Sequence, residues 1–239
     1  MPDRRMHRGA HPGDAERFAE GALPALRAAA VDLCLLLSRG YTAKASMKLV
    51  GDRFRLDQRQ RAAVLRTSCS DVALARRLAC RVDEREMRGR QLWLDGFNVL
   101  TTVEAALGGA AVFAARDACF RDLMGVHGSY RQVAETEPAI SLVGAALDVW
   151  GVSRCVWLLD SPVSNSGRLR GALAEVARAR GWDWEVRLEH SPDRVLRATD
   201  RVIGSADGAI LDACGSWLNL ACAVVTGHVK EAWIVELFP

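Results

Sequence analysis

Four aspartates follow apolar segments in the second part of the chain. Asp95 ends QLWLD and Asp160 ends RCVWLLD. Asp193 comes just after WDWEVRLEH, and Asp207 follows RVIGSA. If these segments are parallel strands, their carboxyl ends meet at one edge of the sheet, where such sheets bind ligands. The four carboxylates are then expected to converge, which is unfavourable unless a cation neutralises them.

Clustered carboxylates without His or Cys partners are typical ligands of hard divalent cations. We therefore expect Mg²⁺ or Mn²⁺ as the cofactor, acting on a phosphate by activating water and stabilising the leaving oxygen. Asn98, three residues after Asp95, is expected to orient Asp95 or to contact a phosphate. An aspartate after a strand is also a common helix N-cap, so a structural role is the alternative for each of the four.

The elements that must position these residues alternate between strand and helix. This alternation predicts an α/β fold with a mostly parallel, Rossmann-like sheet of about five strands and helices on both faces. Residues 101–125 and 138–150 are expected to be helical, ACAVV to be the fifth strand, and AWIVEL is the candidate for a sixth. Asp200 precedes its strand and is expected at the opposite edge.

The segment DGFNVL resembles the first-strand motif of NYN domains, which belong to the PIN-like nuclease superfamily. RCVWLLDSPVSNSG is similar to the second acidic strand end of that family, and SPDRVLRA with RVIGSADGAILD resembles its later aspartates. The resemblance covers about residues 91–226. It implies a metal-dependent ribonuclease or RNA-processing fold. It also implies metal ligands at Asp95, Asp160, Asp193 and Asp207.

Two polar segments depart from that pattern and are candidates for substrate contact. The turn after Asp160 carries the donors Ser161, Ser164, Asn165 and Ser166. The segment RDLMGVHGSYRQVAET carries His127 and Arg131, which we expect to contact nucleic acid. An additional carboxylate is expected from Glu104 or from a helix holding Asp117 and Asp122.

The first part of the chain has a different character. Residues 1–90 hold 19 Lys+Arg and 11 Asp+Glu, whereas the remainder carries a formal net charge of −5. We expect a flexible arm at residues 1–20, a basic all-helical module at 21–88 and the PIN-like domain at 91–239. Arginine matches phosphate oxygens in a bidentate way. The module residues expected to contact RNA are Lys44, Lys48, Arg53, Arg55 and Arg59.

Several classes of protein are disfavoured by the sequence. The seven scattered cysteines form no C-x-x-C pair, which disfavours a zinc ribbon or a disulfide framework and favours a cytoplasmic protein. The N-terminus lacks an apolar signal core, and no apolar segment is expected to span a membrane. Neither a G-x-x-x-x-G-K-[ST] nor a G-x-G-x-x-G motif occurs.

We therefore expect hydrolysis of RNA phosphodiesters that depends on a divalent metal ion. RNA is the expected partner, and a homodimer is left open. One alternative is a catalytically inactive protein of the same fold that binds RNA or acts as a scaffold. Another is a metal-dependent phosphatase of a small molecule, which would not need the basic module.

Overall fold

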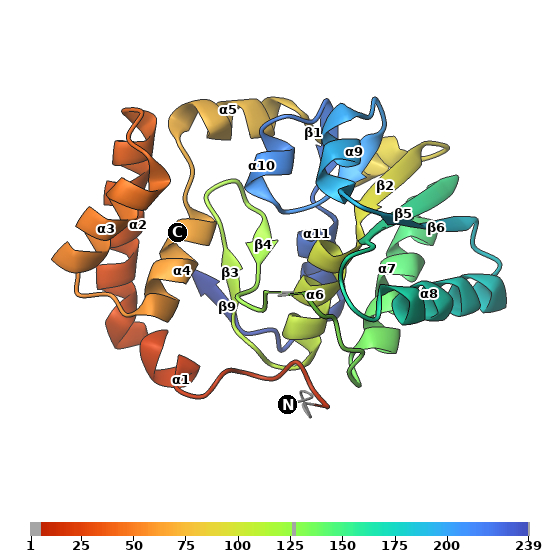
Figure 1. The fold of residues 1–239 in the computed structure, drawn as a ribbon, viewed down its shortest axis with the longest axis horizontal. Coiled ribbons are helices and arrows are strands. Elements are labelled where there is room, and N and C mark those ends of the chain that lie inside the picture. Colours follow the sequence, from red (N-terminus) through yellow and green to blue (C-terminus); the bar gives the residue numbers. More distant parts are fainter. Residues whose placement is uncertain (1–5, 126–127, 239) are drawn as a thin grey trace.

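The protein is described by a computed structural model that covers residues 6–125 and 128–238 (Figure 1). Its largest element is a six-stranded, all-parallel sheet with the order β1-β8-β7-β2-β5-β6. The strands are β1 (Arg81–Val82), β2 (Gln91–Asp95), β5 (Arg154–Asp160), β6 (Trp184–Glu189), β7 (Val202–Gly204) and β8 (Ser216–Leu218). The expected α/β class is confirmed, with one strand more than the expected five.

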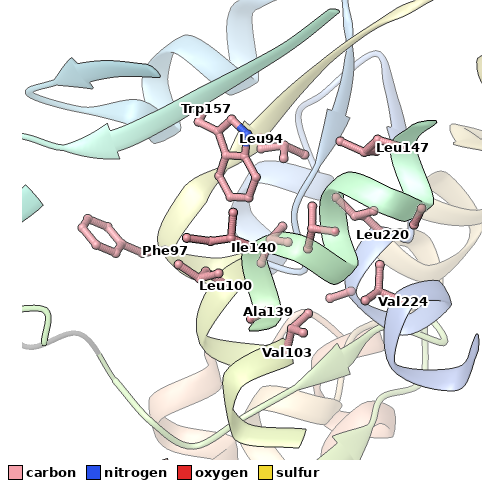
Figure 2. Packing of buried hydrophobic residues seen from close by; sticks show 14 of the residues in the cluster. Leu94, Phe97, Leu100, Val103, Ala139, Ile140, Leu147, Trp157, Leu220 and Val224 are labelled. Atoms are coloured by element: carbon pink, nitrogen blue, oxygen red, sulfur yellow. The ribbon is translucent and has the colours of Figure 1, made fainter. Parts of the chain in front are cut away.

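The central strands β2 and β5 are covered on both faces, which explains why they read as nearly continuous apolar runs. Their register pairs Leu94 with Trp157 and Asp95 with Leu158. One face is covered by α6 (Gly96–Leu107), α7 (Thr136–Val149), α8 (Ser166–Arg180) and α11 (Leu220–His228). Figure 2 shows Leu94 and Trp157 of the sheet beside side chains such as Leu100 and Ile140.

The opposite face of the large sheet is covered by shorter elements. These are α9 (Pro192–Ala198) and α10 (Gly208–Leu211). Leu196 and Ile210 of these helices pack with Leu158, Ile203 and Trp217 of the strands. The helices that follow Asp95, Asp160 and Asp207 are α6, α8 and α10, and all three start at the carboxyl edge of the large sheet.

A second sheet joins the α/β part to the N-terminal helices. It has the order β4-β3-β9, formed by β3 (Val112–Ala114), β4 (Phe120–Arg121) and β9 (Ile234–Glu236). Phe113 and Val235 of this sheet share one core with Leu26, Leu33 and Val64 of the helices. Figure 1 shows this small sheet between the helices and the large sheet.

Some of the N-terminal helices begin at a side-chain cap. The elements of this region are α1 (Asp14–Arg17), the 3-10 turn η1 (Glu20–Ala22), α2 (Leu23–Ser38), α3 (Ala43–Arg53), α4 (Gln58–Thr67) and α5 (Asp71–Ala79), with a further 3-10 turn, η2 (Glu84–Met87), before β2. Asp57 and Gln60 form a capping box at the start of α4, and Ser70 caps α5.

Within the described residues, one helical stretch has the length and apolar composition to cross a membrane. It runs from Glu20 to Ser38, with a mean hydropathy of 1.5. Leu26, Ala30 and Leu33 of this stretch are fully buried in the core. Buried core helices have the same length and composition, so the absence of a membrane partner stays a prediction.

Three sequence expectations are wrong. ACAVV lies inside α11, because a short run of small and β-branched residues also suits a buried helix. Residues 112–121 form the β3–β4 hairpin, because Gly108 and Gly109 end α6 and β9 supplies a distant partner strand. AWIVEL does form a strand, but in the small sheet rather than the large one.

The N-terminal arm is also different from expectation where the structure describes it. Phe18 is buried against Phe113, with ring centroids 4.7 Å apart. Asp14 is fully buried and accepts hydrogen bonds from the Arg59 guanidinium at 2.5 and 2.7 Å. Residues 6–20 therefore belong to the folded body, because they supply buried apolar and charged groups.

Candidate functional site

The candidate site lies where the strand order of the large sheet reverses. From β2 the chain continues through β5 to β6 on one side, and then returns to β7 and β8 on the other side. The crevice beyond the carboxyl ends of β2 and β7 is therefore a topological switch point, the usual ligand position in open parallel sheets. Asp95 ends β2, and Ser205 directly follows β7.

Asp95 is held in this crevice by hydrogen bonds. It is 8% exposed, and its Oδ2 accepts a hydrogen bond from Ser205 Oγ at 2.8 Å. Although Asp95 occupies the N-cap position of α6, its side chain makes no cap hydrogen bond. A capping role therefore does not explain the carboxylate.

Gly96 allows α6 to begin directly after the strand. A Cβ at this position would lie 2.5 Å from Leu159 Cδ2 and 2.9 Å from the Leu158 carbonyl oxygen. Gly96 thus allows both the direct start of α6 after β2 and the close approach of β5. Asn98 connects the two sides of the crevice, because its Oδ1 accepts a hydrogen bond from Ala206 N at 2.8 Å.

The environment of Asp95 strongly favours its protonated form. Burial raises the pKa of Asp95 to about 7. The hydrogen bond from Ser205 opposes this shift, while the negative charges of Asp193 and Asp207 add to it. A carboxyl group whose pKa lies near neutrality in a crevice is a typical feature of functional sites.

The pKa values of two further aspartates at this edge, Asp160 and Asp193, are also raised. Burial raises the pKa of Asp160, and the charge of Asp193 raises it further. Burial also raises the pKa of Asp193, with a further contribution from Asp207. Asp193 thus acts on Asp95 and Asp160, and Asp207 acts on Asp95 and Asp193. We call the four aspartates at this edge of the sheet the acidic rim: Asp95, Asp160, Asp193 and Asp207.

Asp207 has a structural role as well. Its Oδ1 accepts hydrogen bonds from Ala209 N at 2.8 Å and Ile210 N at 3.2 Å, which caps α10. Its backbone N–H donates to Ser205 Oγ at 3.0 Å. One carboxylate oxygen of Asp207 therefore caps a helix, as the structural alternative predicts, whereas the Asp95 carboxylate caps none.

The donor chemistry of the acidic rim fits a hard divalent cation in part. Among the residues that the structure describes, no three Asp, Glu, His or Cys side chains are arranged closely enough to hold an ion together. Mg²⁺ commonly binds through one or two carboxylates and retains several waters. Asp95 with one neighbouring aspartate meets that requirement without a three-residue cage.

A cleft of about 330 Å³ opens beside the acidic rim, between the N-terminal helices and the α/β part. Asn98 and Asp207 line it on the α/β side, and Arg66 and Ser68 line it on the helical side. Sequence reasoning missed the helical-side residues, because nothing local links them to Asp207, which lies more than 130 positions later. We call this feature the helix–rim cleft, lined by Leu65, Arg66, Ser68, Arg77, Asn98, Thr102, Arg121, Asp122, Ala206, Asp207 and Gly208.

Two buried arginines fix the wall of this cleft. Arg121 donates to both carboxylate oxygens of Asp117, at 3.0 and 2.7 Å, and to the Ala206 carbonyl at 2.7 Å. Arg77 donates to Asp117 at 2.7 Å and to Asp212 at 2.7 and 3.0 Å. The turn that carries Asp207 is thus anchored at both ends.

The extra carboxylates suggested by the sequence are used for structure. Asp117 lies in the β3–β4 turn rather than on a helix, and its charge is matched by the two arginines. Asp122 accepts hydrogen bonds from Thr101 and Thr102. Glu104 is fully buried and pairs with Arg8 at 2.8 Å. These groups therefore do not extend the acidic rim.

The structure separates the predicted nucleic-acid contacts. Arg59 is occupied by the buried Asp14, so its assignment as an RNA contact is wrong. Lys48 is exposed and pairs with Asp52 at 2.9 Å. Arg53 lies 3.7 Å from Asp32. Lys44 and Arg55 are exposed on the same helical region.

The polar turn after β5 and the preceding loop are partly structural. Asn165 has a φ of 71° and donates to the Tyr130 carbonyl at 2.9 Å, while Ser164 pairs with Ser129 in a β-bridge. The Ser166 hydroxyl lies 2.6 Å from the Asp160 carbonyl and is buried, so it is not a substrate donor. Ser161 is exposed.

The remaining predicted contacts in the segment before α7 have different outcomes. Arg131 is half-buried, and its carbonyl accepts a hydrogen bond from Arg8 at 3.1 Å. His127 lies outside the described residues.

All seven cysteines are free.

Comparisons with known proteins agree with this two-part organisation. A family model described as Protein of unknown function (DUF434) matches residues 25–79, the region of α2 to α5. The chain is 28% identical over 182 residues to Uncharacterized protein MJ0935 of Methanocaldococcus jannaschii, an alignment that covers 75% of this chain and 86% of that protein. No solved structure matches the chain significantly.

A second family model covers the candidate site. It matches residues 84–223, which is more than half of the chain and contains the whole acidic rim. The chain therefore belongs to the family described as Domain of unknown function (DUF5616).

Proposed function

We propose that this protein is a ribonuclease or RNA-processing enzyme of PIN-like type, which hydrolyses phosphodiester bonds with the help of Mg²⁺ or Mn²⁺. The observation that carries the proposal is the acidic rim at the topological switch point. There, burial and neighbouring negative charge raise the pKa of Asp95 to about 7. Unpaired, mutually repelling carboxylates are costly to a folded protein, and a bound cation would remove that cost.

The residues of the chain have separate tasks in this proposal. Asp95 and one neighbouring aspartate would hold the ion through carboxylate oxygens. Ser205 orients the Asp95 carboxylate through its hydrogen bond of 2.8 Å. When bound, the cation would activate a water molecule and stabilise the departing oxygen of the phosphodiester.

The proposal is tested by incubating labelled single-stranded RNA with the purified protein and Mn²⁺. We expect cleavage by the wild type, and Asp95→Asn to reduce its rate at least about 100-fold. Asp200→Asn is the matched control, because Asp200 is exposed and precedes β7 at the opposite edge of the sheet. Equal cleavage by wild type and Asp95→Asn would show that the activity belongs to another site or to a contaminant.

A second candidate function is RNA binding without catalysis. It is favoured by the lack, within the described part of the chain, of three acidic side chains arranged around one ion position. It is also favoured by the use of Asp207 as a helix cap. A non-catalytic protein would bind RNA equally with Mn²⁺ or EDTA and would leave the RNA intact in both.

A further inference from the structure

The helix–rim cleft joins two parts of the chain that the family models treat separately. Arg66 and Ser68 come from the helical region, whereas Asn98 and Asp207 come from the α/β part. Because Asp207 belongs to the acidic rim, a ligand in this cleft would reach the proposed reaction centre directly. The volume of about 330 Å³ is at the lower end of ligand pockets, about 300–1,000 Å³.

Arg66 supplies an unneutralised positive charge to this cleft. Its guanidinium donates to the backbone carbonyl of Asp122 at 2.6 Å. Within residues 6–125 and 128–238, no carboxylate forms an ion pair with it. Arg77 and Arg121 on the same wall are instead matched by Asp117. Arg66 is therefore the cation of the cleft that is available for an anionic ligand.

A second observation points to a missing hydrogen-bond partner at the same place. Among the residues that the structure describes, none forms a hydrogen bond with the buried Oγ atom of Ser68, and Ser68 lines the cleft together with Arg66. An unsatisfied buried polar group is unfavourable to the folded state. A rotation of the Ser68 side chain toward the cleft would let this hydroxyl donate to a phosphate oxygen that Arg66 binds.

The rival RNA path, over the exposed cations of α3, is less well prepared. Lys48 is paired with Asp52, and Arg53 lies near Asp32. In Figure 1, α3 lies at the end of the molecule far from the large sheet. A strand bound there would need a long path to reach the acidic rim.

We propose that the helix–rim cleft binds the phosphate backbone of a single RNA strand, with Arg66 and Ser68 as its phosphate contacts, and leads the strand to the acidic rim. The choice of RNA rests on the proposed function, whereas the contact to phosphate rests on the cleft itself. The helical region is then part of the substrate site and not a separate binding module.

Binding is measured by fluorescence anisotropy with a labelled 12-nucleotide single-stranded RNA in EDTA, where no cleavage takes place. We expect Arg66→Gln to weaken binding about tenfold and to lower the salt dependence by about one phosphate contact. Arg66→Lys should retain most of the affinity because it keeps the charge. Ser68→Ala should weaken binding less than Arg66→Gln, and Lys48→Gln should change the affinity less than about twofold.

Three outcomes would overturn the cleft proposal. They are no RNA binding by the wild type, unchanged binding by Arg66→Gln, or a larger loss with Lys48→Gln than with Arg66→Gln. The result is separate from the proposed catalysis, because Asp95→Asn should keep RNA affinity in EDTA while losing cleavage in Mn²⁺. Loss of affinity in Arg66→Gln without any cleavage by the wild type would support the cleft and refute the nuclease.

Discussion

Asp117 and Asp95 are both buried aspartates, yet their surroundings act on them in opposite directions. Burial alone would raise the pKa of Asp117, but Arg121 and Arg77 lower it to about 2. Among the described residues, Asp95 has no arginine partner, and burial with neighbouring aspartates raises its pKa to about 7. The charge of the Asp117 carboxylate is thus neutralised by two arginines of the chain, whereas the Asp95 carboxylate is available to a bound cation.

The first prediction concerns the matched carboxylate. Asp117→Asn removes the charge that balances two buried guanidinium groups, so we expect a loss of about 3–5 kcal/mol in the free energy of unfolding. Chemical denaturation measures this loss. Asp71→Asn is the control, because its pair with Arg116 is solvent-exposed and is worth about 0–1 kcal/mol. A loss below 1 kcal/mol for Asp117→Asn would contradict the structural role.

The second prediction concerns the unmatched carboxylate and pH. Between about pH 4 and pH 7, folded wild type retains a proton on Asp95 that the unfolded chain has released. Wild-type stability therefore falls as pH rises through this window, whereas Asn cannot ionise. In EDTA, we expect Asp95→Asn to match the wild type near pH 4 and to exceed it by on the order of 4 kcal/mol above pH 7.

Denaturation curves across this pH range test the prediction. Asp200→Asn should follow the wild type throughout, because Asp200 is exposed and outside the acidic rim. A constant difference between Asp95→Asn and wild type at pH 5 and pH 8 would mean that the Asp95 carboxyl is not destabilised by its surroundings.

The third prediction concerns the close packing behind Asp95. Gly96→Ala would place a Cβ 2.9 Å from the Leu158 carbonyl, so the start of α6 must move. Overpacking of this kind costs about 1–3 kcal/mol. Gly171→Ala in α8 meets no atom within 4 Å and should be neutral or stabilising by up to about 1 kcal/mol. Thermal unfolding compares the two, and equal midpoints would refute the packing argument.

The smallest effect is expected at a surface pair. Lys48→Gln breaks the exposed i,i+4 pair with Asp52, which is worth about 0.3–0.5 kcal/mol. Increasing salt should remove even this difference, since exposed charges are screened. A loss above 1 kcal/mol would show that surface pairs in this protein contribute more than their exposure implies.

Much of the large sheet follows from the sequence. Strands covered on both faces require continuous apolar runs, and such runs precede Asp95 and Asp160. The five-residue segment ACAVV reads as a strand but lies in α11, because a short apolar run in a strand and one in a buried part of a helix have the same composition. The β3–β4 hairpin was missed because its partner β9 lies more than 110 residues away in the chain.

Part of the candidate site is likewise predictable from the sequence, and part of it is not. The four aspartates were predictable, because each follows a strand and parallel strands share one carboxyl edge. The roles of Arg66 and Ser68 were not, since only the packing of α4 and α5 against the α/β part brings them to Asp207. Likewise, Arg59 reads as a surface cation until the fold buries Asp14 beside it.

The central claim is that the acidic rim is left unmatched for a divalent cation. Isothermal titration calorimetry with Mn²⁺ tests it most directly, on the wild type beside Asp95→Asn and Asp200→Asn. We predict binding by the wild type, loss of binding in Asp95→Asn and retained binding in Asp200→Asn. Absence of binding in the wild type, or equal binding in Asp95→Asn, would contradict the claim.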